Sequence, residues 1–418
     1  MQAFGDIVRQ VFQSIWAHRL RSFLTMFGIA WGVASLLLLI GLGEGFRAGQ
    51  TRSLSQIGTD VIMIFGSTIP AVPGQHSGML PYNLTMGDLD AIQRLAPHVR
   101  AATALINRGD LKEVSEYSSA SGPVMGVEAN FAQIRHVPLA EGRFLDSEDV
   151  AERHMVVVLG QKNDELLYPS QHAVGKFITI NGYRFQVVGV VQKIGRGNDS
   201  GENQKIYVPL PTMLQLFPIK GENVPGNAVT AINYQPLDAA RNETAKAEVH
   251  GIIGRRHGFD PANKDAFEEW DTINSGRMIG VIFTAMDVFL GGVGIVTLAL
   301  GAVGIINIML VTVSERTKEI GLRKALGATN RSIMMQFFLE GLTLTGLSGL
   351  IGIAAAAGLM ALLHNVVGTA VQGFDPPRLV PWSAAMAVGT LAVCGIVSGV
   401  YPARRAARLE PVEALRKD

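Results

Sequence analysis

The chain has 418 residues, of which 48% are hydrophobic and 17% are charged, and its mean hydropathy is +0.26. This balance is typical of a membrane protein that also carries a large water-soluble part. The formal net charge of +1 provides no basic field, so we expect no nucleic-acid partner. The single cysteine, Cys394, excludes a disulfide framework, a cysteine-based zinc site and a CxxC redox motif within one chain.

The N-terminal region mixes basic and apolar positions before a long apolar run. Residues 1–22 predict a cytoplasmic amphipathic helix at the membrane surface, because no small-residue cleavage site follows a short apolar core. Residues 23–43 are uncharged and long enough to cross a hydrocarbon core of roughly 30 Å as transmembrane helix 1. Arg19 and Arg21 precede this run and predict a cytoplasmic N-terminus.

Residues 44–278 contain no other apolar run of that length, and we expect a large mixed α/β extracytoplasmic domain there. Thr85 and Asp88 have the spacing of a capping box and predict the start of a helix that ends near residue 95. Further strands and one more helix are expected at 60–65, 100–107, 124–128, 227–234 and 238–257.

A β-rich subdomain is expected at about 136–224, inserted between two α/β pieces whose ends pack together near the membrane. Asn181-Gly182 separates two β-like runs, and both residues suit the positive φ angles of a tight hairpin turn. The strands expected in this subdomain lie at 155–159, 177–180, 183–191 and 206–210.

Three further apolar segments complete the membrane part. The first is rich in glycine and too long for the membrane core, so its outer end should project as a stalk. Basic flanks place both termini in the cytoplasm. The fold class that follows is an α-helical membrane protein with four transmembrane helices and a large mixed α/β extracytoplasmic domain inserted between helices 1 and 2. The remaining segments are 279–313 (stalk and helix 2), 332–363 (helix 3), 364–381 (outer loop), 382–402 (helix 4) and 403–418 (cytoplasmic tail).

The loop at 314–331 lies between transmembrane helices 2 and 3 and carries five basic residues against two acidic ones. Short loops rich in Lys and Arg stay in the cytoplasm. Ile320, Leu322 and Leu326 interleave with the charges at roughly helical spacing, and Gly327 offers a C-terminal stop. The pattern alone leaves two interpretations open: a solvated loop that only fixes topology, and a short amphipathic helix that a cytoplasmic partner binds.

Catalytic motifs are not found in the sequence. Gly175-Lys176 lacks the earlier glycine of a phosphate-binding loop, and neither HExxH nor GxSxG occurs. Asp287 and Glu340 lie near the ends of apolar segments, where an interface or an arginine partner explains a carboxylate sufficiently. We therefore expect no catalytic residue, no metal site and no cofactor in this chain, which on this view is not itself an enzyme.

Several stretches resemble, in order and spacing, the MacB/FtsX-type permeases of ABC transporters: AHRLRSFLTMFGIAWGVASLLLLIGLGEG, SERTKEIGLRKALGATNRSI and YPARRAARLEPVEAL. The middle of the chain is similar to the periplasmic domain of MacB-type permeases through EGRFLDSED, MVVVLG, VGKFITINGYRFQVVGVV and IYVPL. The resemblance implies a homodimer or paired permease, held on its cytoplasmic face by ATP-binding subunits. It also implies that the loop at 314–331 is a coupling helix that contacts the ATPase through Glu315, Arg316, Glu319, Ile320, Gly321, Arg323, Lys324, Leu326, Gly327 and Ala328.

The same resemblance implies the function. The chain begins at the amphipathic helix, so the ATPase that binds ATP and Mg is expected to be a separate polypeptide. The expected role is the permease subunit of an efflux transporter of the inner (plasma) membrane, surrounded by lipid, that exports antibiotics, peptides or lipidic compounds. A periplasmic adaptor and an outer-membrane channel are further expected partners. Two alternatives remain: FtsX-like signalling to a cell-wall hydrolase, and lipoprotein extraction of the LolC/LolE kind. The residues that bind cargo are not predicted.

Overall fold

The computed structural model describes residues 19–55, 58, 60–69, 80–194, 201–367, 374–408 and 410. The amphipathic helix expected at 1–22 and the end of the basic tail therefore lie largely outside the described residues. Contacts divide the chain into two compact units. One is an α/β unit, Gln50–Gly280, and the other is a helical unit formed by the sequence on either side of it.

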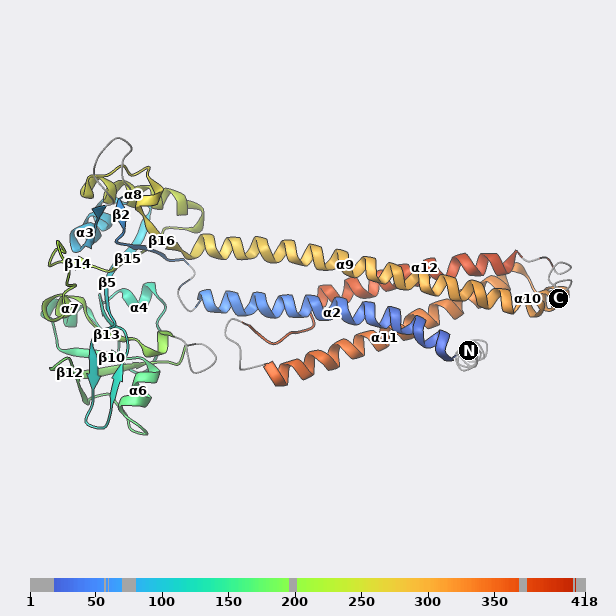
Figure 1. Cartoon of the computed structure of the whole chain (residues 1–418), viewed down its shortest axis with the longest axis horizontal. Helices are drawn as coiled ribbons and strands as arrows, with labels where there is room; N and C mark the ends of the chain where they lie inside the picture. Colours follow the sequence, from blue (N-terminus) through green and yellow to red (C-terminus); the bar gives the residue numbers. More distant parts are fainter. Residues whose placement is uncertain are drawn as a thin grey trace. The chain divides into compact units, whose positions relative to one another are not determined.

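Four helices of the described chain are long and apolar enough to cross a membrane (Figure 1). They are α2 (Arg19–Ser55), α9 (Thr272–Glu315), α11 (Asn330–Val367) and α12 (Pro381–Ala407). The segments expected to span the membrane, at 23–43, 279–313, 332–363 and 382–402, fall within these helices. The 44 residues of α9 extend over about 66 Å at the α-helical rise, which is more than a hydrocarbon core needs.

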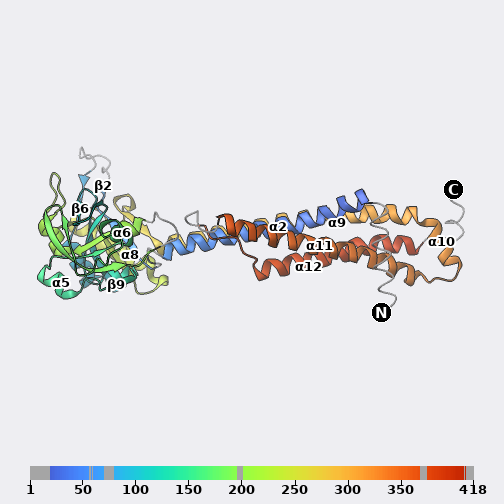
Figure 2. The ribbon, with the colours of Figure 1, turned by 90° about the horizontal axis from the view of Figure 1, so that it is seen from below.

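Small residues let the helices of this unit approach closely. A Cβ added at Gly341 of α11 would lie 3.1 Å from the Cα of Gly399 in α12. At Gly352 of α11 it would lie 2.6 Å from the carbonyl oxygen of Ala30 in α2, so a side chain there would separate the two helices. The helices run alongside one another in both views (Figures 1 and 2). Their shared core includes Ile29, Val33, Leu36, Leu298, Ile305, Phe337, Ala356 and Met360.

The α/β unit is built on one mixed sheet of 12 strands with the order β16-β1-β15-β5-β8-β13-β10-β12-β11-β6-β7, in which β9 also pairs with β12. Two further sheets of two strands each occur among the described residues. The strands of the large sheet are β1 (Ile62–Phe65), β5 (Val99–Arg108), β6 (Lys112–Val114), β7 (Ser119–Ser121), β8 (Val124–Val127), β9 (Leu139–Gly142), β10 (Val156–Leu159), β11 (Phe177–Ile180), β12 (Tyr183–Val191), β13 (Ile206–Pro209), β15 (Ala231–Pro236) and β16 (Glu268–Asp271). The small sheets are β2 (Thr68–Ile69) with β3 (Leu80–Pro81), and β4 (Leu84–Thr85) with β14 (Ala228–Val229).

Side chains alternate between two cores, one on each face of the sheet. Ile106 and Val157 belong to the larger core, whereas their neighbours Leu105 and Val158 belong to the smaller one. Helices α3 (Met86–Leu95), α6 (Gln161–Leu167), α7 (Leu210–Leu216) and α8 (Asn242–His257) contribute buried residues to the larger core, and α4 (Phe131–Ile134) contributes Phe131 to the smaller. A further short helix is α5 (Ser147–Glu152).

Local predictions for this unit are confirmed. Thr85 and Asp88 form the capping box of α3. Asn181 and Gly182 have φ angles of +49° and +95° and join β11 to β12. The ends of the domain also meet, because β1 pairs antiparallel with β16.

The expected insertion of a β-rich subdomain at about 136–224 needs correction. Its strands β9, β10, β12 and β13 are part of the same sheet as β5, β15 and β1, so the sheet does not stop at the subdomain boundary. The physical reason is pairing between strands on either side of the boundary: β13 pairs parallel with β8, and β11 pairs antiparallel with β6. A local hydrophobic pattern contains no information about such partners.

Candidate functional site

A short separate helix, α10 (Thr317–Ala325), connects α9 to α11 within the loop expected at 314–331. It ends where Gly327 adopts a φ angle of +100°, a conformation that favours glycine. The N–H of Gly327 donates to the carbonyl of Lys324, and the N–H of Ala328 donates to that of Arg323, each at 3.0 Å. These bonds close the C-terminus of α10 and turn the chain into α11.

The inner face of α10 is part of the bundle core. Ile320 is 2% exposed, and Gly321 is also buried. Ile320 belongs to the same apolar cluster as Ile333 of α11 and Ala403 of α12. A nine-residue helix is marginal in isolation, so this packing is what holds α10 in place.

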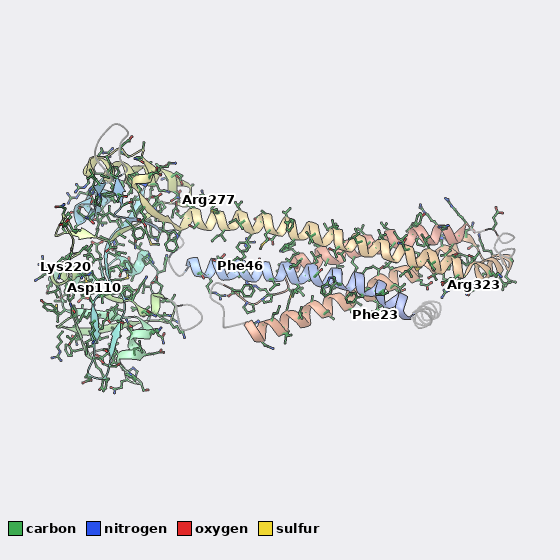
Figure 3. The ribbon with its side chains drawn as sticks, viewed as in Figure 1. Phe23, Phe46, Asp110, Lys220, Arg277 and Arg323 are labelled. Carbon is green, nitrogen blue, oxygen red and sulfur yellow. The ribbon has the colours of Figure 1, made fainter. Side chains whose placement is uncertain are left out.

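Polar contacts also fix α10 to the two following helices. The Arg323 guanidinium donates from Nη1 to Oε1 of Gln336 on α11, at 2.9 Å, and Nζ of Lys324 donates to the carbonyl of Ala407 on α12, at 2.8 Å. Figure 3 labels Arg323 at this end of the helical unit. A rigid connection to both helices follows.

An ion pair stands beside these bonds. Nη1 of Arg316, at the N-cap of α10, lies 3.6 Å from Oε2 of Glu340 on α11. The Glu340 side chain is only 7% exposed. Because the carboxylate of Glu340 is buried, this contact helps to hold the N-terminal end of α10 against α11.

The outer face of α10 exposes apolar side chains. Leu322 is 54% exposed and Leu326 is 81% exposed, and their spacing of four residues puts them on one side of the helix. Among the ten residues assigned to ATPase contact from the sequence, Glu315, Glu319, Leu326 and Gly327 are exposed, whereas Ile320 and Gly321 are buried. Arg316, Arg323, Lys324 and Ala328 are half-buried.

The sequence-based set omitted three exposed residues of this helix, Lys318, Leu322 and Ala325. The available signal was the separation of Leu322 and Leu326 from Ile320 around a helical wheel. We call the surface formed by Lys318, Glu319, Leu322, Ala325 and Leu326 the α10 outer face.

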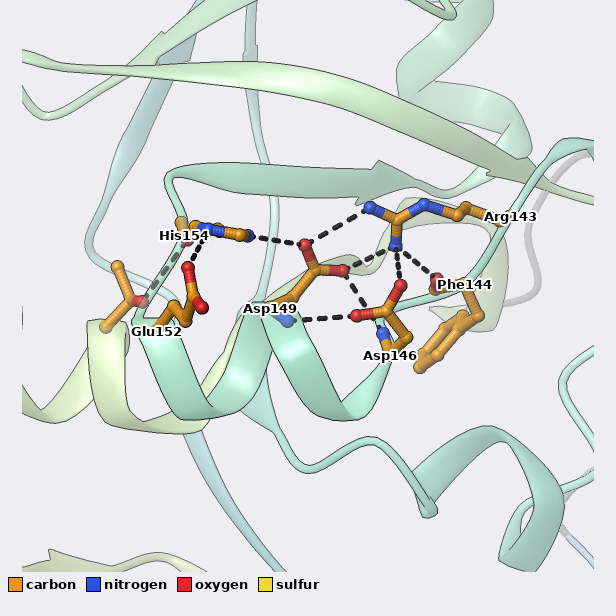
Figure 4. Close-up of polar contacts among 7 residues, drawn as sticks. Arg143, Phe144, Asp146, Asp149, Glu152 and His154 are labelled. Carbon is orange, nitrogen blue, oxygen red and sulfur yellow. Dashed lines mark hydrogen bonds and ion pairs between the residues drawn. The ribbon is translucent and has the colours of Figure 1, made fainter.

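A polar cluster in the α/β unit is a second candidate site (Figure 4). Arg143 donates from Nη1 to Oδ2 of Asp149 at 2.5 Å, and Asp146 forms a capping box with Asp149 at the start of α5. Burial favours a higher pKa for Asp149, but hydrogen bonds from Arg143, the Asp146 backbone and His154 lower its pKa to about 2. The buried carboxylate is thus fully occupied by structural partners, and the cluster fastens α5 to the preceding loop.

Groups of three or more His, Cys, Asp and Glu side chains placed to hold a metal ion do not occur in the described part of the chain.

Comparison with known proteins decides the family. Residues 22–252, more than half of the chain, match the family model of the MacB-like periplasmic core domain. The chain belongs to the MacB-like family. Residues 291–411 match a second model, the FtsX-like permease C-terminal domain, which covers α10. The MacB-like chain thus combines a periplasmic core domain with an FtsX-like permease domain, and four of its described helices are long and apolar enough to cross a membrane.

Curated relatives match throughout this MacB-like chain. A macrolide export ATP-binding/permease protein MacB of Bdellovibrio bacteriovorus is 29% identical over 419 residues, covering 98% of this chain and 61% of that protein. The protein of the same name from Azoarcus sp. is 31% identical over 429 residues, covering 100% of this chain and 60% of that protein. The chain thus spans about 60% of the length of these relatives. The crystal structure of the periplasmic region of MacB from Actinobacillus actinomycetemcomitans is similar with a TM-score of 0.43 and 19% identity, covering 54% of this chain and 95% of that one.

Proposed function

We propose that this chain is the permease subunit of an ABC-type efflux transporter and that a separate cytoplasmic ATP-binding subunit binds the α10 outer face. The observation that carries the proposal is the two-sided construction of α10, which is fixed to α11 and α12 inside and exposes Leu322 and Leu326 outside. The relatives named above are ATP-binding/permease proteins for macrolide export, and this supports a machine driven by ATP.

The docking step follows from exposed apolar surface. Leu322 and Leu326 form a pair at the tip of a short helix, flanked by the charges of Lys318 and Glu319. An amphipathic helix of this kind enters an apolar groove with its leucines as anchors. Full burial of one leucine stabilises a complex by about 1.5–3 kcal/mol, so the pair supplies a substantial share of the affinity.

Movement of the ATP-binding subunits would then reach the bundle through α10. The contacts of Arg323 with Gln336 and of Lys324 with Ala407 would transfer displacement to α11 and α12. Coupling of this kind requires packed, stiff elements between the two ends of the pathway.

Helix α9 supplies a continuous element that begins in the α/β unit. Thr272, its first residue, exchanges hydrogen bonds with both the N–H and the carbonyl of Val61, at 3.0 and 2.7 Å. Asp271 accepts from the N–H of Asn274 at 2.9 Å and from the side chain of Asn242 at 2.7 Å. Because these bonds secure the first turn of α9 to the sheet, we propose that α9 carries displacement to the α/β unit rather than lining a water-filled pore.

The orientation and the assembly belong to the same proposal. Arg323, Arg331, Arg404 and Arg405 lie at the α10 end of the helices, which supports a cytoplasmic position for that end and for both termini. We propose a homodimer or paired permease in the inner membrane, with a periplasmic adaptor and an outer-membrane channel as further partners. The proposed cargo is an antibiotic, a peptide or a lipidic compound.

The decisive test is purification of the solubilised chain from its native membrane, followed by measurement of vanadate-sensitive ATPase activity. We expect an ATP-binding subunit to co-purify with the wild-type chain. In the double variant L322D/L326D, the recovered ATPase should fall at least tenfold, because charged groups cannot enter an apolar groove.

The control is Leu95→Asp, which changes a leucine of similar exposure (65%) in the α/β unit. It should leave the recovery of the ATPase unchanged. Recovery of a folded wild-type chain without any ATPase would refute the proposed transporter, and equal recovery with L322D/L326D would refute docking through the α10 outer face.

A further inference from the structure

A recess of about 530 Å³ lies at the end of the sheet in the α/β unit. Its floor is the exposed face of three neighbouring strands, where Val114 of β6, Thr179 of β11 and Arg184 of β12 are paired in register. Residues two apart on a strand share a face, so Phe177 lies beside Thr179 on this floor. The rim comprises Ser115, Glu116, Gly175 and Lys176.

Two cations flank the recess without a carboxylate partner in the described part of the chain. The guanidinium of Arg184 lies 3.9 Å from the centre of the Phe177 ring. The ammonium of Lys176 lies 5.2 Å from the ring of Tyr117 and 5.1 Å from that of Tyr168, and it donates to Gln171. Aromatic faces position both cations while leaving their charges uncompensated.

Polar groups make up most of the lining of the recess, and three apolar or aromatic side chains in it or beside it are only partly covered. Val114 is 39% exposed, Phe177 is 44% exposed and Tyr117 is 51% exposed. The opposite face of the same strands is closed, because Ile178, Ile180 and Phe185 are each no more than 1% exposed. Aromatic and aliphatic side chains remain open on one face only, beside unpaired positive charges.

The charged residues around the recess favour an anionic ligand. Among the described residues that line the recess, Glu116 is the one acidic side chain, against Lys176 and Arg184. The volume lies within the range of small-molecule sites, roughly 300–1,000 Å³, and Val114 and Phe177 supply the apolar part of a mainly polar lining. A carboxylate, sulfonate or phosphate group suits the two cations, and a flat apolar body suits Phe177 and Val114.

We propose that this recess binds a small organic anion with an aromatic or otherwise apolar body. Its acidic group lies between Lys176 and Arg184, and its body covers Phe177. The site is built entirely from the α/β unit, so the proposal is independent of ATP and of the α10 outer face.

The test uses the full-length chain in phosphatidylcholine nanodiscs, with naphthalene-2-sulfonate as the probe and isothermal titration calorimetry as the readout. Empty nanodiscs correct for partition into lipid. We expect saturable binding of the sulfonate, which weakens in high salt, and at least tenfold weaker binding of the neutral analogue 2-naphthol. Each cation should contribute about tenfold to the affinity, as a charge-assisted hydrogen bond does.

The matched variants are K176Q/R184Q and R94Q/K193Q. Both remove two positive charges, but Arg94 and Lys193 are exposed residues outside the recess. Binding should weaken at least tenfold in K176Q/R184Q and remain unchanged in R94Q/K193Q, and equal unfolding temperatures would establish that both variants are folded. Absence of saturable binding, equal binding by the two double variants, or equal affinity for 2-naphthol would each overturn the proposal.

Discussion

The carboxyl group of Glu113 makes the stability of the α/β unit depend on pH in an unusual direction. Glu113 lies on β6 with its side chain on the buried face of the sheet and is 0% exposed. No hydrogen bond of normal geometry reaches either carboxylate oxygen among the described residues. Burial raises the pKa of Glu113 from 4.5 to about 7, although the nearby N–H groups of Glu113 itself and Gly122 partly oppose the rise.

The sign of the effect follows from proton binding. Between pH 4.5 and about 7 the folded state holds a proton on Glu113 that the unfolded chain has released. The stability present below pH 4.5 is therefore lost as the pH rises through 7. At about 1.4 kcal/mol per pKa unit, the loss amounts to about 3 kcal/mol, which lowers the unfolding temperature of a domain of this size by roughly 6–12 °C.

The assay is scanning calorimetry of the full-length chain in detergent at pH 5 and pH 9, following the transition of the α/β unit. Glu113→Gln keeps the shape of the side chain but cannot ionise, so most of the decrease in unfolding temperature between the two pH values should disappear. Glu116→Gln is the control, because Glu116 is exposed and lies three residues further along the chain. Asp164, whose pKa is raised by burial to about 6, contributes equally to both variants. An equal pH dependence in E113Q and E116Q would refute the reasoning.

Two further predictions concern other positions. We expect Gly327→Val to reduce the vanadate-sensitive ATPase activity of the purified complex, because its φ of +100° strains a β-branched residue by about 1–2 kcal/mol. Gly304→Ala in α9 should leave activity unchanged, because a Cβ added at Gly304 meets no heavy atom of a neighbouring element within 4 Å. We expect Asp88→Asn to destabilise the α/β unit by about 3–5 kcal/mol in calorimetry at pH 7. Asp88 is buried, and burial by itself raises its pKa, but hydrogen bonds from His257, Arg256 and Thr85 lower the pKa to about 2. The stabilisation by the ionised carboxylate therefore persists above pH 4 and is lost as the pH falls toward 2. Exposed Asp90→Asn should change stability by less than about 0.5 kcal/mol, and an equal effect of both variants would contradict the prediction.

The features that could be predicted from the sequence are those set by local physics. Uncharged runs such as 23–43 predict helices because length and composition alone satisfy the backbone in an apolar medium. Asn181-Gly182 predicts a turn because few other residues accept its φ angles. The pairing of β8 with β13 could not be predicted, since it joins segments about 80 residues apart through the backbone. The structure joins these segments as neighbouring strands of one sheet.

In the candidate site, too, the local sequence predicts the helix but not which of its residues are buried. Ile320, Leu322 and Leu326 are all apolar, and although a helical wheel separates Ile320 from the two leucines, the pattern does not tell which of these two sides faces the bundle. Packing against α11 and α12 makes that choice, burying Ile320 and leaving the two leucines exposed.

Neighbouring side chains on the two faces of α10 have different roles. Ile320, Arg323 and Lys324 bind the helix to α11 and α12, so their exchange would alter the position of α10 whatever protein binds it. Leu322 and Leu326 are largely exposed, and we expect their exchange to alter mainly the affinity for a partner. A surface that merely fixed membrane topology would need the positive charges but not the leucines, because topology follows Lys and Arg alone. The exposed leucines are therefore the feature that a topology signal leaves unexplained and that a docking helix requires.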